Sequence, residues 1–197
     1  SWIKELARKA KDDINFLRNN NYIFFPITII KRKSYTPEGL IETDYTDTIN
    51  YLIDTIHSIN KNILIIIRPH PTSKIDDLKH ILEKSKHKNI RISFTNSLFL
   101  IQYCNFMIRY GISLMDPKVK YYNKVCIRYH TKEILAVSGA QISDKEKLPG
   151  GIFDVKTKKD LREKVLNALN NKIKIRKNNL EEISEEKILK KFINYLN

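Results

Sequence analysis

The sequence predicts an α/β fold in which helices cover both faces of a parallel sheet, with further helices at the two ends of the chain. Short apolar runs rich in Ile and Val alternate with segments whose apolar residues recur at helical spacing. The connections between runs are long enough for the right-handed crossovers that parallel strands require. The 197 residues suit one domain, and 42% apolar residues are enough for a sizeable core.

The first part of the chain is predicted to contain a helix, a strand and a second helix. Residues 1–20 carry apolar side chains at helical spacing and are followed by polar residues, which predicts a leading amphipathic helix. Residues 22–30 form the first predicted strand, in which Pro26 indicates a bulge, an edge position or the true end of the strand. Residues 31–44 are polar and are expected to be irregular, and residues 45–60 are predicted to be helical.

The most informative stretch is an apolar run that ends in an Arg-Pro-His-Pro sequence. Residues 63–67 are all Ile or Leu, as expected for a strand that is buried on both faces, and Arg-Pro-His-Pro follows at 68–71. Residues 72–86 then have helical spacing. Because ligands of open α/β sheets bind at the carboxyl ends of the strands, we expect functional chemistry in this loop.

The remaining sequence continues the alternation. Three further strands are predicted, two of them followed by a helix: 90–94 (helix from Ser97), 106–109 (helix from about Ile112) and 124–128. Residues 133–138 are predicted to form a short strand or a turn, and 148–153 a loop. Helices are predicted at 158–171 and 179–196, so that a leading helix (1–20), a core (22–155) and a helical tail (156–197) make up a single domain.

The chain is strongly basic. It has 36 Lys and Arg against 22 Asp and Glu, a net charge of +14. This excess indicates an anionic partner, such as a nucleotide, a nucleic acid, a phosphorylated sugar or an anionic membrane surface. The alternative is diffuse, solubilising charge spread over helix faces. Nucleic acid is disfavoured, because basic and aromatic residues are not interleaved as they are in proteins that stack bases.

The cysteines and the apolar runs bear on location. Cys104 and Cys126 stand among apolar residues without a Cys-x-x-Cys pair, so we expect them to be buried and reduced, as in a cytoplasm. No apolar run is as long as a membrane span, and the N-terminus lacks the apolar core of a signal peptide. The expected location is cytoplasmic, with peripheral contact with the inner membrane as an alternative. The helix-like start without Met indicates a piece of a longer, two-domain protein.

The polar residues at the ends of the predicted strands are the candidate site, because the carboxyl ends of parallel strands share one edge. They are Thr28, Lys31, Arg68, His70, Thr95, Arg109, Tyr110, Gly111, Ser113, Arg128 and His130. Cations, hydroxyl groups and the starts of helices at one edge predict an anion site. Prolines on both sides of His70 hold its loop extended and favour a ligand contact there. For Arg68, Arg109 and His130 a purely structural role stays open.

Other kinds of site have little support in the sequence. There is no Gly-x-x-x-x-Gly-Lys-Ser/Thr loop and no Gly-x-Gly-x-x-Gly fingerprint, which argues against nucleoside triphosphatases and typical nicotinamide enzymes. The acidic pairs 44/47 and 76/77 are ordinary for helix N-termini, so no metal is expected. Neither cysteine stands in the context of a nucleophile. His57, His80 and His87 lie on predicted helix faces and are expected to be solvated.

At the strand ends the chain resembles the nucleotide-sugar-binding, C-terminal domain of GT-B glycosyltransferases. The likeness is greatest to the bacterial capsule and surface-polysaccharide group, which includes sialyl and Kdo transferases and, more remotely, polyglycerophosphate transferases. Residues 24–28 are similar to its opening strand, and Arg-Pro-His-Pro at 68–71 is similar to its Lys/Arg-x-His-Pro motif. Residues 89–108 are similar to the helix and strand before its serine-rich turn, and the whole likeness covers about residues 22–170.

The resemblance implies a Rossmann-like donor-binding domain of a metal-independent glycosyltransferase, or of a related glycerophosphotransferase, without a cofactor. It implies that His70 is the catalytic residue and a ligand of the donor phosphate, that Ser113 binds the same phosphate, and that Asp116 holds the ribose. Our site hypothesis adds residues from the strand ends: Arg68, Arg109 and Gly111 for the phosphates, Thr28 for the nucleoside, and Arg128 and His130 as secondary candidates.

The implied partners are a nucleotide-sugar donor and a polysaccharide or glycolipid acceptor. The general base is expected from an N-terminal acceptor domain or from a partner chain, since 197 residues leave no room for that domain. An alternative of another class is a non-catalytic, degenerate Rossmann-like domain that serves as a binding or scaffold unit in a polysaccharide assembly complex. A basic nucleic-acid-binding protein is the more remote alternative.

Overall fold

The structure is a computed structural model that describes most of the chain. The described residues are 14–27, 30–36, 39–70, 73, 75–84, 87–110, 115–130 and 151–175. The predicted segments 133–138 and 179–196 lie outside them, as do residues 1–13 of the predicted leading helix. Residues 14–19 of that helix are helical. Among the described residues, no helix is long and apolar enough to cross a membrane.

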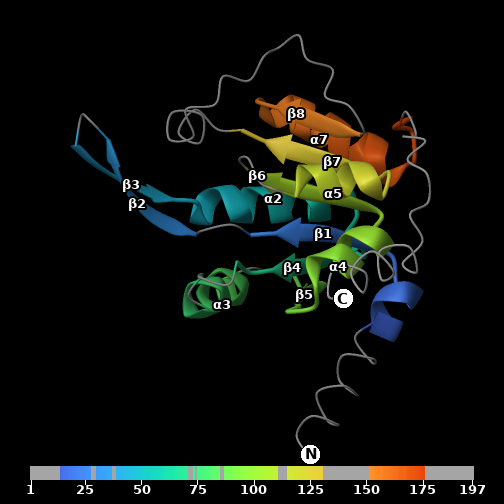
Figure 1. The fold of residues 1–197 in the computed structure, drawn as a ribbon, viewed down its shortest axis with the longest axis horizontal. Helices are drawn as coiled ribbons and strands as arrows, with labels where there is room; N and C mark the ends of the chain where they lie inside the picture. Colours follow the sequence, from blue (N-terminus) through green and yellow to red (C-terminus); the bar gives the residue numbers. More distant parts are fainter. Residues whose placement is uncertain are drawn as a thin grey trace, which may run out of the picture.

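Within the described residues, six strands form one parallel sheet in the order β5-β4-β1-β6-β7-β8 (Figure 1). The strands are β1 (Tyr22–Pro26), β4 (Leu64–Arg68), β5 (Ile90–Ile92), β6 (Phe106–Tyr110), β7 (Val125–Tyr129) and β8 (Ile152–Val155). The predicted fold class, a parallel α/β sheet, is therefore confirmed. All six carboxyl ends lie at one edge, which we call the carboxyl edge.

Helices cover both faces of the sheet, and each face has its own apolar cluster. One face packs against α2 (Thr46–Ile59), α3 (Ile75–Lys84) and α7 (Lys158–Leu169). The other face packs against α4 (Ser97–Tyr103), α5 (Asp116–Tyr121) and the helical residues 14–19. The two clusters follow from strand alternation, since successive side chains of a strand point to opposite faces.

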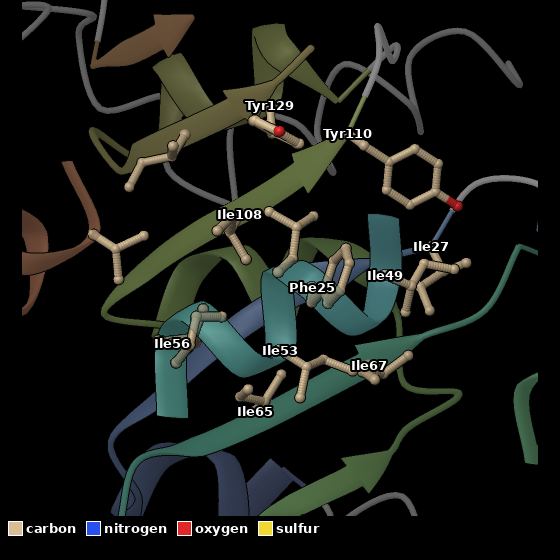
Figure 2. Packing of buried hydrophobic residues seen from close by; sticks show 14 of the residues in the cluster. Phe25, Ile27, Ile49, Ile53, Ile56, Ile65, Ile67, Ile108, Tyr110 and Tyr129 are labelled. Atoms are coloured by element: carbon tan, nitrogen blue, oxygen red, sulfur yellow. The ribbon is translucent and has the colours of Figure 1, made fainter. Parts of the chain in front are cut away.

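The larger core lies between α2 and the middle of the sheet. Figure 2 shows Ile53 of α2 close to Phe25 of β1 and to Ile65 of β4, all fully buried. Apolar residues of α2 recur every three or four positions, which places them on one side of the helix. Burial of each such side chain contributes about 1.5–3 kcal/mol. This packing stabilises the middle strands, which lead to the carboxyl edge.

Two predicted segments differ in the structure. Residues 31–44, expected to be irregular, form an antiparallel hairpin of β2 (Lys31–Thr36) and β3 (Gly39–Asp44) that stands away from the sheet (Figure 1). Two of its facing pairs are ion pairs, with 2.5 Å between Lys33 Nζ and Glu42 Oε1 and 3.8 Å between Lys31 Nζ and Asp44 Oδ2. Lys, Arg, Ser, Thr, Glu and Asp make up most of its sequence, so the apolar alternation by which strands are recognised is weak here.

The second difference is β8, because residues 148–153 were expected to be a loop but the strand begins at Ile152. Gly151 directly before it has φ of +77°, a backbone conformation that favours glycine. The two glycines before a strand of only four residues indicated a loop, and the edge strand was therefore not predicted. Pro26 is the true end of β1, the third of the alternatives that the sequence left open.

Candidate functional site

The Arg-Pro-His-Pro motif lies at the carboxyl edge, as predicted. Arg68 is the last residue of β4, and its half-buried side chain donates from Nε to the carbonyl of Thr95 at 3.0 Å. Among the described residues no carboxylate pairs with Arg68. Pro69 is buried and His70 is exposed, and a turn follows in which Ser73 N donates to the His70 carbonyl at 2.9 Å. Strand β4 thus ends in a guanidinium that meets no carboxylate of the described residues, and an exposed imidazole follows two residues later.

Further along the edge, the structure brings five ionisable side chains together, which we call the charge cluster. Its members are Arg109, Asp116, Arg128, Asp154 and His130. They come from the ends of β6, β7 and β8 and from the start of α5. By strand alternation Arg109, Arg128 and Asp154 lie on the face that α4 and α5 cover, directly above Met107, Cys126 and Ile152 of the smaller apolar cluster.

The charge cluster is a chain in which two arginines and one histidine alternate with two aspartates. Arg109 Nη2 donates to Oδ1 of Asp116, and Arg128 Nη1 donates to Oδ2 of the same carboxylate at 2.8 Å. Arg128 also donates to Asp154 twice, from Nε to Oδ1 at 2.6 Å and from Nη2 to Oδ2 at 2.5 Å. His130 Nε2 lies 2.6 Å from Oδ1 of Asp154. Each carboxylate therefore bridges two cationic or imidazole groups.

Burial and charge together determine the ionisation of the cluster. The side chains of Arg109 and His130 are 0% exposed, and that of Asp154 is 14% exposed. Burial by itself would raise the pKa of Asp154, but the hydrogen bonds from His130 and Arg128 outweigh it, so this pKa lies below its ordinary value. Burial would lower the pKa of Arg128, yet the bonds to Asp154 raise it. Both groups are therefore charged at neutral pH.

The candidate residues from the sequence thus fall into two groups and a remainder. Arg109, Asp116, Arg128 and His130 lie in the charge cluster, with their charged groups already bonded to one another or to Asp154. Arg68 and His70 lie at the end of β4, which is separated from β6 by β1. Of the other candidates, Lys31 begins β2, Thr95 accepts from Arg68 through its carbonyl, and Tyr110 is the buried last residue of β6. Thr28, Gly111 and Ser113 lie outside the described residues. The helix expected from about Ile112 begins at Asp116.

Asp154 was not anticipated from the sequence. It lies just beyond the predicted loop, in a strand of only four residues, and no motif marks it. The signal that could have identified it is the alternation of side chains along the strand. Ile152 and Val155 are buried on opposite faces of the sheet, and Asp154 lies on the same face as Ile152. Only the pairing of β7 with β8 in register, Arg128 opposite Asp154, shows that this acid meets a cation.

The environments of the two cysteines and of His57 bear on predictions made from the sequence. Cys104 and Cys126 are free and buried, as expected, and burial raises the pKa of Cys126 to about 11. His57, expected to be solvated, is buried, with its Nε2 3.3 Å from the Ile63 carbonyl and its ring 4.3 Å from that of His87.

Within the described part of the chain, no group of three His, Cys, Asp or Glu side chains is placed to hold a metal ion.

Comparisons with known proteins give similarities of structure alone. No family model matches the chain. No curated protein matches it in sequence. Among solved structures, the chain is similar to the glycosyltransferase VinC in complex with dTDP, with 10% identity and a TM-score of 0.45 over 79% of this chain and 35% of that one.

Two further solved structures are similar. For TarM the identity is 17% and the TM-score 0.48, over 88% of this chain and 35% of that one. For the glycosyltransferase SnogD from Streptomyces nogalater the identity is 9% and the TM-score 0.38, over 77% and 40%. The chain therefore spans 35–40% of the length of these three proteins.

Proposed function

We propose that this chain is the donor-binding domain of a glycosyltransferase that builds a surface polysaccharide. In this proposal the carboxyl edge binds the phosphates of a nucleotide-sugar and stabilises the negative charge that develops on the departing nucleotide. The sugar then passes to a polysaccharide or glycolipid acceptor. The acceptor site and the general base belong to a further domain or a partner chain.

The observation that carries the proposal is the position of Arg68 and His70 at the end of β4 in a parallel sheet. Ligands of such sheets bind beyond the carboxyl ends of the strands. Arg68 donates to a neutral carbonyl, so its positive charge is not matched by a carboxylate among the described residues. The ten-residue helix α3 follows the motif, and the positive end of its dipole lies at the same edge.

The charge cluster refines the assignment of the phosphate contact. Arg109 and Arg128 are matched by Asp116 and Asp154, so their charges are largely compensated within the protein. We therefore propose Arg68 and His70 as the direct phosphate ligands. Both carboxylate oxygens of Asp116 accept from arginines, so a ribose hydroxyl would donate to a remaining lone pair of an oxygen that already has an arginine partner.

The test is binding of nucleotides to the isolated chain, measured by calorimetry and by thermal unfolding. The panel is UDP, CDP, CMP and dTDP, because the sequence does not define the base. A ligand at 100 times its dissociation constant adds about 2.7 kcal/mol to the stability of the folded chain. We expect at least one nucleotide to bind and to raise the unfolding temperature.

Substitutions locate the binding to the motif. Arg68→Ala and His70→Ala each remove a charge-assisted hydrogen bond worth about 1.5–3 kcal/mol, so we expect dissociation constants about 10- to 150-fold higher. Arg162→Ala is the matched control, because Arg162 is exposed on α7 and, among the described residues, bonds only the Ser58 hydroxyl. Equal affinity of the wild type and both motif variants would refute the assignment of these residues.

A second candidate function is a non-catalytic binding or scaffold domain. The observation that favours it is the internal compensation of Arg109 and Arg128, because two cations of the predicted anion site already have partners. The same panel separates the candidates. A nucleotide that binds through Arg68 and His70 supports the transferase, and no response to any nucleotide supports the scaffold.

A further inference from the structure

We propose that Asp154 is a positioning residue that presents the Nδ1 atom of His130 to a phosphate group of the ligand at the carboxyl edge. This inference rests on the proposed function, and it adds a second phosphate contact on the β7–β8 side of the edge. His130 touches the ligand in this proposal, whereas Asp154 acts only through His130.

The first support is the geometry that fixes the imidazole ring. His130 follows β7, and its backbone N–H donates to the Val155 carbonyl at 2.9 Å, which continues the pairing with β8. Its Nε2 lies 2.6 Å from Oδ1 of Asp154. The Asp154 carboxylate is held in turn by two bonds from Arg128. Because an ionised carboxylate only accepts, Nε2 is the donor, and the orientation of the ring is set.

The second support is the other nitrogen of the same ring. Nδ1 of His130 is buried and has no hydrogen-bond partner among the described residues, and the whole side chain is 0% exposed. Leaving a buried polar atom unsatisfied costs about 1–3 kcal/mol. A ring held through one nitrogen leaves the other for a further partner, and His130, unlike the buried His57, stands at the carboxyl edge, where ligands of such sheets bind.

The charges around His130 favour an anionic ligand. Its Nε2 contacts Asp154 of β8, and through this carboxylate the ring is linked to Arg128 of β7 and then to Asp116 of α5. The two arginines of the cluster balance its two aspartates, so a hydrogen at Nδ1 of His130 in addition to the one at Nε2 gives the cluster one net positive charge. A phosphate oxygen that accepts from Nδ1–H compensates this charge and satisfies the buried nitrogen.

The experiment uses the full 197-residue chain, with inorganic pyrophosphate as a probe that is independent of the nucleoside. We expect His130→Gln and Asp154→Asn each to raise the dissociation constant of pyrophosphate about tenfold. The double variant should bind no more weakly than the single variants, because Asp154 acts through His130. Glu83→Gln is the control, since Glu83 is exposed near the end of α3 that lies away from the carboxyl edge, and we expect no change for it.

A spectroscopic readout separates positioning from a general loss of structure. In protein labelled with ¹⁵N at histidine, the signals of His130 are identified by their loss in His130→Gln. On saturation with pyrophosphate we expect both ring nitrogens of His130 to shift to the values of an imidazolium. In Asp154→Asn this shift should be smaller at saturation. His130→Gln leaves the bonds between Asp154 and Arg128 in place. If Asp154→Asn does not fold, the pyrophosphate affinity of His130→Gln still tests the proposal.

The outcomes distinguish this inference from the proposed function. If a nucleotide and pyrophosphate bind the wild type but the His130 signals stay in place, or if His130→Gln binds as well as the wild type, only the inference is overturned. Additive losses in the double variant would also overturn the positioning role of Asp154. If no nucleotide and no pyrophosphate binds, both proposals fail.

Discussion

Arg128 and Asp154 face each other in register on β7 and β8, and their side chains form two parallel hydrogen bonds of 2.6 and 2.5 Å. Such bidentate pairs define orientation as well as adding energy. Here the pair connects the four-residue edge strand β8 to the rest of the sheet. The same carboxylate holds His130, so one contact between neighbouring strands arranges two side chains at the carboxyl edge.

Asp116→Ala is expected to destabilise the fold strongly. Asp116 accepts from both Arg109 and Arg128, and Arg109 is fully buried. Removal of one partner of a buried ion pair leaves a charge without compensation and typically costs about 3–5 kcal/mol. Urea unfolding followed by circular dichroism measures this loss. Asp76→Ala removes an exposed carboxylate and is the control, and a loss as small as that of the control would show that Asp116 carries little of the cluster's stability.

The buried His57 is expected to make folding depend on pH. Burial, and next the neighbouring His87, lower the pKa of His57 below its ordinary value of 6.5. The unfolded chain therefore binds a proton more readily than the folded chain does. The stability that depends on neutral His57 is fully present above pH 6.5 and is lost as the pH falls from 6.5 toward the lower pKa of the folded state.

The measurement is the free energy of unfolding of the wild type and of His57→Phe between pH 8 and pH 5. We expect the slope over this range to be shallower in His57→Phe. His70→Gln is the matched control, because His70 is exposed, and it should keep the slope of the wild type. A wild-type stability that stays constant between pH 7 and pH 5 would contradict the prediction.

Gly151→Ala is expected to destabilise the start of β8. Gly151 has φ of +77°, and a Cβ there would lie 2.7 Å from the Lys124 carbonyl oxygen. Backbone strain of this kind costs about 1–3 kcal/mol, and the clash adds to it. Gly39→Ala in the hairpin is the comparison, because a Cβ there meets no atom within 4 Å, although φ is +128°. Thermal unfolding should show the larger loss for Gly151→Ala, and equal losses would exclude the close approach as the cause.

The parts of the fold that depend on local pattern were predictable. The apolar run that became β4, and the helical spacing of α2 and α7, each follow from one continuous segment of sequence. The placement of Arg68 and His70 at the carboxyl edge also followed, because strand direction and the end of the run suffice to locate them. The β2–β3 hairpin and the short strand β8 were not predicted, because their local sequence patterns are weak.

The sequence by itself determined the fold class, the burial of the cysteines and the edge at which the Arg-Pro-His-Pro motif lies, because each depends on the periodicity of neighbouring residues. Only the tertiary structure decided that Asp154 meets Arg128 and His130, and that the ring of His57 packs against that of His87. These contacts join residues 24 to 30 positions apart. Strand order and register bring them together, and no local pattern encodes which distant charge or ring will be the partner.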